Sequence, residues 1–266
     1  MILAQISDLH VMRAGKRAYG VFDTSACLAR AVDRLNALSP RPDVVLITGD
    51  LVDTGSADEY ARLAAELARL EIPYRLIPGN HDARATLRTA FPAQPWDGEG
   101  DAVCQYVDDT WPVRIVGLDS LVPGEVAGSL CDARLDWLDR ILARDPARPT
   151  VVMIHHPPFD TGIDHMDRLP LRGAEAFAAV LARHDCVLRV VSGHAHRAMS
   201  ATLGGRICTT CPSTAHHFAL DLEPGVPARW TPEPPGFQVH RFLGGNRLVT
   251  HAATIEAFPA TRAKAG

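Results

Sequence analysis

The sequence predicts an α/β sandwich, and three features of the chain support that fold class. Short apolar runs rich in β-branched residues recur along the chain and are typical of buried strands. Segments with apolar residues at helical spacing lie between these runs. Most runs end in a polar or turn-forming residue, and strand alternating with helix is the pattern of an α/β sandwich. The predicted strands are "MILAQIS", "DVVLIT", "PYRLI", "VRIVGL", "TVVMI" and "VLRVVS".

The helices are expected between these strands. Residues 24–38 place Ala, Leu and Val at helical spacing. Residues 56–70 open with Ser56-Ala-Asp-Glu59, a capping box, before Leu and Ala repeat at intervals of three and four. The same spacing predicts helices over residues 132–142 and 173–183. Asp82 is expected either to cap a helix over residues 83–90 or to tie down the loop before it.

The character of the chain changes toward its C-terminus. Residues 203–221 are expected to form short strands and loops. The proline-rich run "EPGVPARWTPEPPG" over residues 223–236 excludes regular helix and central strand. Gly244-Gly245-Asn246 then predicts a hairpin turn between two alternating strands. We expect the proline-rich run and the hairpin to roof a site or to form a contact between subunits.

Composition excludes several classes of protein. The 266 residues carry a net charge of −4, so no basic field is available for a nucleic acid polymer. No apolar run approaches the length of a membrane span, and the N-terminus lacks the basic region of a signal peptide. Six scattered cysteines do not form a disulfide framework, and Cys208-x-x-Cys211 is expected to pack a strand. These features predict a cytoplasmic protein.

Carboxylates, imidazoles and one amide gather at or just past the predicted strand ends. Ligands of open α/β sheets bind beyond the carboxyl ends of the strands, so these side chains are expected to converge. Each of these short motifs, taken alone, can also be explained as a turn or as a histidine packed in the core. Gly193-His194-Ala195-His196 is stronger, because His-x-His on an extended segment puts both rings on one side. The strand-end residues are Asp8, His10, Asp50, Asn80, His81, His155, His194 and His196.

The donor types indicate a pair of metal ions. Two carboxylates, one amide oxygen and four imidazoles suit Zn, Mn, Fe or Co better than Ca or Mg. Seven side chains oversupply one metal, whereas two metals about 3.5–4 Å apart that share a carboxylate fit the count. Cysteine takes no part in the set, so a structural zinc knuckle is not predicted.

The spacing of these residues resembles that of the calcineurin-like metallophosphoesterases. Five blocks carry the resemblance: Asp8-x-His10, Gly49-Asp50-x-x-Asp53, Gly79-Asn80-His81-Asp82, His155-x-Pro157 and Gly193-His194-x-His196. Ala18-Tyr19-Gly20, Met166-Asp167 and "HHPP" at residues 155–158 further resemble the bacterial class III cyclic nucleotide phosphodiesterase and glycerophosphodiesterase branch.

The resemblance implies a four-layer αββα sandwich with a catalytic domain over residues 1–221. Residues 222–266 would form a small extension that packs on the core or makes an oligomer contact. One metal would be held by Asp8, His10, Asp50 and His196. The other would be held by Asp50, Asn80, His155 and His194, with Asp50 bridging.

The implied reaction is hydrolysis of a small phosphodiester, a cyclic nucleotide or a glycerophosphodiester, by a metal-bound hydroxide. His81 is expected to act as general acid or electrostatic stabiliser for the leaving group. Asp53 is expected to orient His81, or else to be a turn residue. His216 is expected at the pocket rim or on the surface, and His165 is expected to contact substrate from a loop.

Other functions stay open on the same fold. A phosphomonoesterase or nucleotide hydrolase could use the same metals, and the loops 11–22, 83–101 and 157–172 would decide. A non-catalytic scaffold is disfavoured by the complete ligand set, and a DNA nuclease by the acidic charge. A homo-oligomer, a dimer or larger, is expected.

Overall fold

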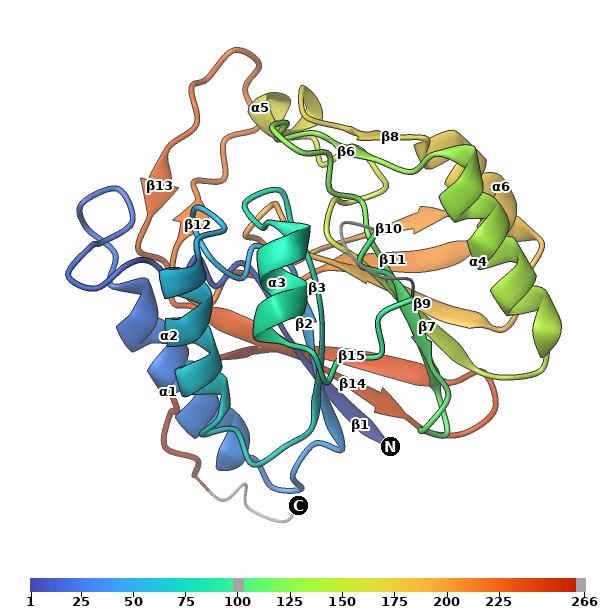
Figure 1. The fold of residues 1–266 in the computed structure, drawn as a ribbon, viewed down its shortest axis with the longest axis horizontal. Helices are drawn as coiled ribbons and strands as arrows, with labels where there is room; N and C mark the ends of the chain where they lie inside the picture. The colour runs from blue at the N-terminus through green and yellow to red at the C-terminus, as the bar shows by residue number, and fades with distance from the viewer. Residues whose placement is uncertain (98–102, 262–266) are drawn as a thin grey trace.

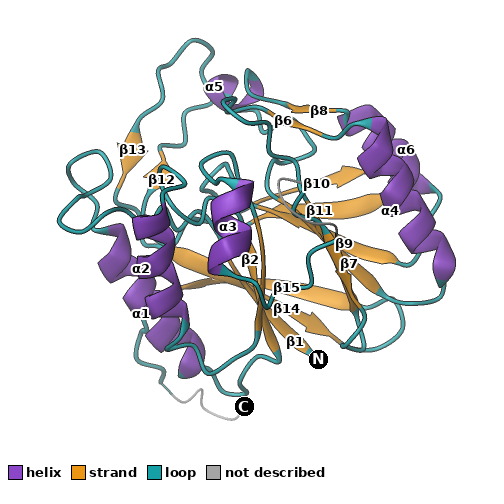
Figure 2. Cartoon of the chain, in the orientation of Figure 1, coloured by secondary structure: helices purple, strands orange, loops and turns teal. Residues whose placement is uncertain are grey.

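The computed structural model describes residues 1–97 and 103–261, and these form a layered α/β structure (Figures 1 and 2). The helices are α1 (Thr24–Asn36), α2 (Ala57–Leu67), α3 (Arg84–Ala90), α4 (Asp132–Arg144), α5 (Asp164–Asp167) and α6 (Ala174–Ala182). The long strands are β1 (Ile2–Ile6), β2 (Val44–Thr48), β3 (Tyr74–Ile77), β5 (Arg114–Leu118), β7 (Thr150–Ile154), β9 (Val187–Ser192), β10 (Met199–Leu203), β11 (Arg206–Thr210), β14 (Gly236–Phe242) and β15 (Leu248–Thr254). The short strands are β4 (Tyr106–Asp108), β6 (Gly128–Ser129), β8 (Leu171–Arg172), β12 (His217–Phe218) and β13 (Trp230–Thr231).

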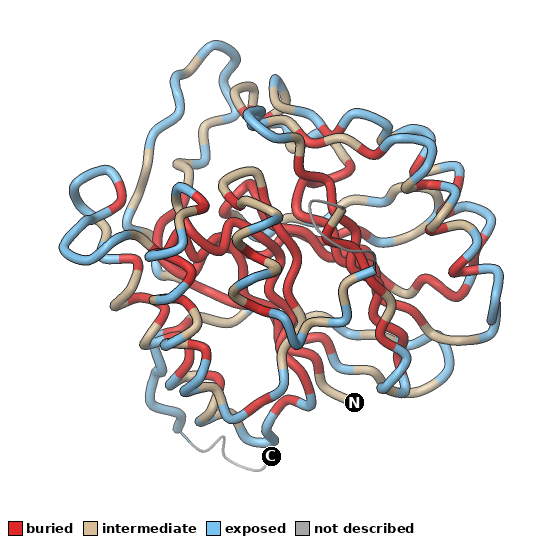
Figure 3. Tube along the Cα trace, viewed as in Figure 1, coloured by how far each residue is buried: buried red, intermediate tan, exposed pale blue. Residues whose placement is uncertain are grey.

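Two mixed sheets form the centre of the molecule. The first has the order β15-β14-β1-β2-β3, in which β1, β2 and β3 are parallel and β14 runs antiparallel to β1. The second has the order β10-β11-β9-β7-β5-β4, with a parallel centre and antiparallel edge strands. Strands β2, β5 and β7 are wholly buried, as expected for parallel strands covered on both faces, and buried residues concentrate in the central sheets (Figure 3).

Three separate hydrophobic clusters confirm the predicted four layers. Within β2, Val45 and Ile47 pack with α1, α2 and α3, whereas Val44 and Leu46 pack toward the second sheet. Alternation is equally regular in the second sheet, where Val152 and Ile154 of β7 pack against α4 and α6. Because successive side chains of a strand point to opposite faces, each sheet has one face toward helices and one toward the other sheet.

The predicted helices form with small shifts at their ends. The capping box of α2 is present, since the Glu59 carboxylate accepts from the backbone N–H of Ser56 at 3.3 Å and of Thr54 at 2.9 Å. The N-cap of α3 is Ala83, so Asp82 does not cap that helix. The alternative expectation, that Asp82 ties down its loop, is the one the hydrogen bonds support, as described below.

The C-terminal hairpin is part of the first sheet. β14 pairs with β1 over Ile2 to Gln5 and with β15 over its full length. The predicted turn is present, with Gly244 and Gly245 both at positive φ. The division of the chain at residue 221 stays a prediction, and residues 262–266 of the predicted extension lie outside the described residues. No helix in the described part of the chain is long and apolar enough to cross a membrane.

Candidate metal centre

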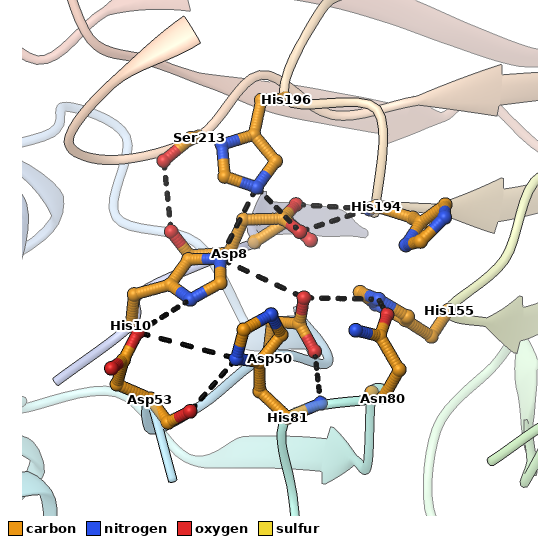
Figure 4. Close-up of polar contacts among 12 residues, drawn as sticks. Asp8, His10, Asp50, Asp53, Asn80, His81, His155, His194, His196 and Ser213 are labelled. Carbon is orange, nitrogen blue, oxygen red and sulfur yellow. Dashed lines mark hydrogen bonds and ion pairs between the residues drawn. The ribbon is translucent and has the colours of Figure 1, made fainter. Parts of the chain in front are cut away.

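The predicted ligands meet at the carboxyl ends of parallel strands from both sheets (Figure 4). Each follows its strand by a few residues, so the loop that leaves each strand carries the donor. The strands are β1 for Asp8 and His10, β2 for Asp50, β3 for Asn80, β7 for His155, and β9 for His194 and His196. Because the two sheets face each other, their strand ends contribute to one polar cluster.

One group of four ligands is compact. The donor atoms of Asp8, His10, Asp50 and His196 all lie within 4.8 Å of one another. His10 Nε2 is 3.6 Å from Asp50 Oδ2, and His196 Nε2 is 3.4 Å from Asp8 Oδ1. The Nε2 atoms of His10 and His196 face each other at 3.2 Å. This group matches the ligands predicted for the first metal.

A second group shares Asp50 with the first. The same Asp50 Oδ2 is 3.4 Å from His155 Nε2, which in turn is 3.2 Å from Asn80 Oδ1. The His194 ring lies 5.1 Å from the His155 ring, centroid to centroid. Buried His194 Nε2 has no hydrogen-bond partner within the described residues. Asp50 therefore occupies the position expected of a bridging carboxylate.

Backbone carbonyls set the tautomers of two of these histidines. His155 Nδ1 is 2.8 Å from the carbonyl oxygen of Thr48, and His196 Nδ1 is 3.0 Å from that of His216. A carbonyl oxygen only accepts, so each Nδ1 carries a proton, and each ring in its neutral form presents a bare Nε2. Bare Nε2 atoms directed at one another and at carboxylates are suited to hold metal cations.

The backbone is strained at the same residues. Asp8, His10, Asp50, His194 and His196 all have φ between 42° and 66°, and among the described non-glycine residues only Tyr19 joins them at positive φ. Such a conformation costs about 1–3 kcal/mol per residue and clusters at functional sites. A Cβ on Gly79 would lie 2.2 Å from Asp50 Oδ1, so the loop packs closely against the shared carboxylate. The chain maintains this strain where the donors converge.

Burial and charge strongly perturb the pKa values of the cluster. Burial raises the pKa of Asp8 to about 6. Burial lowers the pKa of the His155 ring, but the Asp50 carboxylate outweighs that effect and raises it to about 9. Burial and then the neighbouring His155 lower the pKa of His194 to about 3. With a pKa of about 9, the His155 ring carries a positive charge at neutral pH beside the buried carboxylates. Bound cations would take the place of that ring proton, and the donor set fits two divalent cations.

His81 lies beside both groups while its ring remains available to the pocket. Its backbone N–H donates to Asp50 Oδ1 at 3.0 Å, and its Nδ1 is 2.8 Å from the carbonyl oxygen of Asp53. The Asp53 carboxylate is 4.0 Å from His81 Nδ1 and 3.6 Å from His10 Nδ1. Asp53 thus contacts His81 as predicted, but through its backbone oxygen, and its carboxylate lies nearer to the ligand His10.

Asp82 ties the two metal-binding loops together. Its Oδ2 accepts from the backbone N–H of Gly79 at 2.8 Å and of Leu51 at 3.1 Å, and its Oδ1 accepts from Tyr60 Oη at 2.8 Å. Gly79 precedes Asn80, and Leu51 follows Asp50. The carboxylate therefore couples the position of the bridging ligand to that of its neighbour.

Two predicted substrate contacts lie elsewhere than expected. His216 is fully buried, which contradicts both the pocket rim and the surface. Its ring stacks on Phe22 at 5.0 Å and lies 5.4 Å from the His10 ring, so it is a neighbour of the first metal group. His165 belongs to the short helix α5 and packs on Phe218, whereas its neighbours Met166 and Leu169 line the pocket.

The pocket over the metal groups has residues that sequence reasoning missed. A cavity of about 160 Å³ is lined by six polar residues of the centre and by six apolar or aromatic residues. Loops 11–22 and 157–172 contribute to it as expected, whereas residues 98–101 of the third loop lie outside the described residues. Trp230 comes from the proline-rich run, where no periodic pattern could identify it. The apolar or aromatic residues are Tyr19, Val126, Met166, Leu169, Phe218 and Trp230.

Comparisons with known proteins agree with this geometry. A relative from Arcobacter nitrofigilis, named a probable glycerophosphodiester phosphodiesterase, GpdQ, is 37% identical over 260 residues, which cover 97% of this chain and 94% of that protein. A Pseudomonas aeruginosa relative named 3′,5′-cyclic adenosine monophosphate phosphodiesterase, CpdA, is 34% identical over 257 residues, covering 96% of this chain and 90% of that protein.

Solved structures show the same fold at low identity. The crystal structure of a dimetal phosphatase from Danio rerio matches with a TM-score of 0.71 at 18% identity, covering 96% of this chain and 99% of that one. The family model described as calcineurin-like phosphoesterase matches residues 1–198, which contain all five sequence blocks. The chain belongs to the calcineurin-like phosphoesterase family.

Proposed function

We propose that this protein is a phosphodiesterase that uses two metal ions to hydrolyse small phosphodiesters. The observation that carries the proposal is the convergence of seven donor side chains around a shared Asp50, with His81 beside them. When bound, two divalent cations would neutralise phosphoryl oxygens and make a water molecule more nucleophilic. Asp8, His10, Asp50 and His196 would hold one of them, and Asp50, Asn80, His155 and His194 the other.

His81 is the proposed catalytic residue for the leaving group. Water adds its oxygen to phosphorus, the P–O bond to the leaving alcohol breaks, and the leaving oxygen takes a proton. Because the Asp53 carbonyl holds the Nδ1 proton, Nε2 is the ring atom left to act in the pocket. A neutral His81 has no proton on Nε2, so donation requires the doubly protonated ring.

The pocket lining favours a diester over a monoester. Among the described residues that line the cavity, none is Lys or Arg. A monoester dianion brings one more negative charge than a diester, and no lysine or arginine of the described lining is there to match it. The relatives from Arcobacter and Pseudomonas are both named as phosphodiesterases, which supports the same choice.

A hydrolysis panel tests the proposal. Purified protein supplied with Mn²⁺ would be assayed on 3′,5′-cyclic AMP, glycerophosphocholine, bis-p-nitrophenyl phosphate and p-nitrophenyl phosphate. We expect turnover of at least one natural diester and a higher kcat/KM for the bis-p-nitrophenyl diester than for the monoester. A clear preference for the monoester would instead support the phosphomonoesterase alternative.

Further features of the protein stay predictions. Metal analysis of the purified protein would choose among Mn, Fe, Zn and Co. Light scattering would test the predicted homo-oligomer, and cell fractionation the predicted cytoplasmic location. His165 and His216 remain proposed contributors to substrate binding, although their burial and packing support only an indirect contribution.

A further inference from the structure

The apolar lining of the pocket contains a stack of three aromatic rings. The Tyr19 ring stacks on Trp230 with centroids 4.5 Å apart and planes at 30°, and Trp230 stacks on Phe218 at 3.9 Å and 26°. All three residues line the cavity over the metal groups. Phe218 and Trp230 come from the paired strands β12 and β13, whereas Tyr19 is about 200 positions earlier in the sequence, so the tertiary fold adds the third ring to the stack.

The stack is attached to the metal centre. The Trp230 ring lies 5.2 Å from the ring of the ligand His196 and 4.6 Å from that of His216. The position of the aromatic wall is therefore fixed relative to the place where a phosphoryl group would bind. Predicted metal ligands and the three rings line one cavity, so a substituent on the phosphorus would lie in the same cavity as this wall.

The proline-rich run holds Trp230 in place. β13, which contains Trp230, pairs with β12, so that Trp230 lies opposite Phe218. Both ends of the Glu233 carboxylate accept hydrogen bonds at 3.0 Å from Arg197, which follows the ligand His196. The backbone N–H of Gly225 donates to Asp164 of α5 at 3.0 Å. Prolines on either side limit the freedom of the run, so little entropy is lost when the wall binds a ligand.

Tyr19 presents the outer ring of the stack. Its side chain is exposed, and its backbone lies at φ 52°, which is unfavourable for a residue with a Cβ. Trp230 covers one face of the ring and the His216 ring lies edge-on at 5.5 Å, yet 57% of the residue stays exposed. An exposed aromatic face held by a strained backbone at the mouth of a pocket is suited to receive a flat ligand group.

We propose that this wall selects phosphodiesters with a planar aromatic group, such as the base of a cyclic nucleotide, over diesters of a polyol. The inference rests on the proposed phosphodiesterase function and names its substrate class. A base would gain stacking against Tyr19 and apolar contact with the wall. Glycerol hydroxyls would lose water against Val126, Met166 and Leu169, side chains that offer them no hydrogen-bond partner.

Kinetics on a Trp230→Ala variant test the proposal. Wild-type enzyme with Mn²⁺ should prefer 3′,5′-cyclic AMP to glycerophosphocholine in kcat/KM. The variant should lose about 5- to 150-fold in kcat/KM on cyclic AMP, mainly through KM, as expected for one lost base-stacking support. The ratio of kcat/KM on cyclic AMP to kcat/KM on glycerophosphocholine should therefore fall in the variant, since a polyol gains nothing from stacking. Any common loss caused by the contact of Trp230 with His196 cancels in this ratio.

Controls separate binding from folding. Trp137→Ala removes a similarly half-buried tryptophan from α4, an element far from β12 and β13 (Figure 1). This variant should leave kcat/KM unchanged on both substrates. Trp230→Phe keeps an aromatic ring and should retain most of the cyclic AMP activity even if Trp230→Ala folds poorly. Calorimetric titration of the wild type should show tighter binding of 5′-AMP than of glycerol 3-phosphate.

The outcomes are distinguishable. Turnover of glycerophosphocholine with little or none of cyclic AMP would overturn the inference but leave the phosphodiesterase function intact. Equal loss on both substrates in well-folded Trp230→Ala would also overturn it. No turnover of any diester by metal-loaded wild type would instead contradict the proposed function itself.

Discussion

The Asp82 carboxylate joins the two loops that carry Asp50 and Asn80, and Asp82→Ala removes that connection. The substitution leaves the backbone N–H groups of Gly79 and Leu51 buried without their acceptor. Tyr60 Oη also loses a partner, although it keeps the N–H of Ala83 at 3.1 Å. A change at one residue therefore affects both the loop that carries Asp50 and the loop that carries Asn80.

The magnitude follows from the groups left unpaired. Each orphaned buried donor costs about 1–3 kcal/mol, which gives about 3–9 kcal/mol for the two N–H groups and the Tyr60 hydroxyl, because the bond from Ala83 satisfies only the hydroxyl oxygen. Burial raises the pKa of Asp82 to about 6, so its charged form at pH 7 is itself disfavoured and removing it recovers part of the loss. We expect the free energy of unfolding to fall by about 2–3 kcal/mol. Loosening residues that orient ligands should weaken metal binding by about 10- to 100-fold.

Guanidinium unfolding of the metal-free protein and calorimetric titration with Mn²⁺ measure the two effects. Asp82→Asn is the informative partner variant, because one amide oxygen can accept both N–H groups that Oδ2 accepts in wild type. It should stay within about 1 kcal/mol of wild type. Glu71→Ala removes an exposed ion pair with Arg41 and should cost less than about 1 kcal/mol. Unchanged stability and metal affinity in Asp82→Ala, or an equal loss in Asp82→Asn, would refute the reasoning.

Three further outcomes are expected. His81→Ala should keep its metal content but lose about 10²- to 10⁴-fold in kcat, more on alkyl than on p-nitrophenyl leaving groups, and an equal loss on both would argue against proton donation. Exhaustive chelation should abolish turnover and lower the melting temperature, with both restored by Mn²⁺ or Co²⁺; full activity after chelation would contradict the metal centre. Burial lowers the pKa of His240 to about 3, so the folded state holds fewer protons than the unfolded state between that pH and 6.5. Stability should therefore fall below pH 6.5 by about 1.4 kcal/mol per unit from this group, and pH-dependent unfolding of His240→Gln should show a shallower decline than wild type.

The sequence predicted most helices and strands because the residues within each element favour the structure that the element adopts. β2 and β7 are continuous β-branched and apolar runs buried on both faces, and the capping box at Ser56 marks the start of α2. Such features depend on neighbouring residues alone. Which strands pair with each other does not depend on neighbouring residues alone. For this reason the hairpin β14–β15 was expected as a small extension, whereas it lengthens the first sheet beside β1.

The proposed metal ligands were accessible to sequence reasoning because they follow strands. Asp50 and Asn80 come directly after buried runs, and parallel strands end at one edge of a sheet. His216 shows the limit of that reasoning. Nothing near it in the sequence indicates that its ring contacts Phe22 and His10, because those contacts join residues about 200 positions apart.

By itself, the sequence determined the α/β class, the succession of strands and helices, and the donors offered at the strand ends, since propensity and spacing are local properties. The tertiary structure alone decided that Asp50 is shared, that a backbone oxygen orients His81, and that Trp230 forms a wall over the centre. The hydrogen bond from the His194 N–H to Asp8 spans 186 positions. Contacts of this kind depend on how two sheets pack face to face, which the packing of many side chains sets together and no short segment specifies.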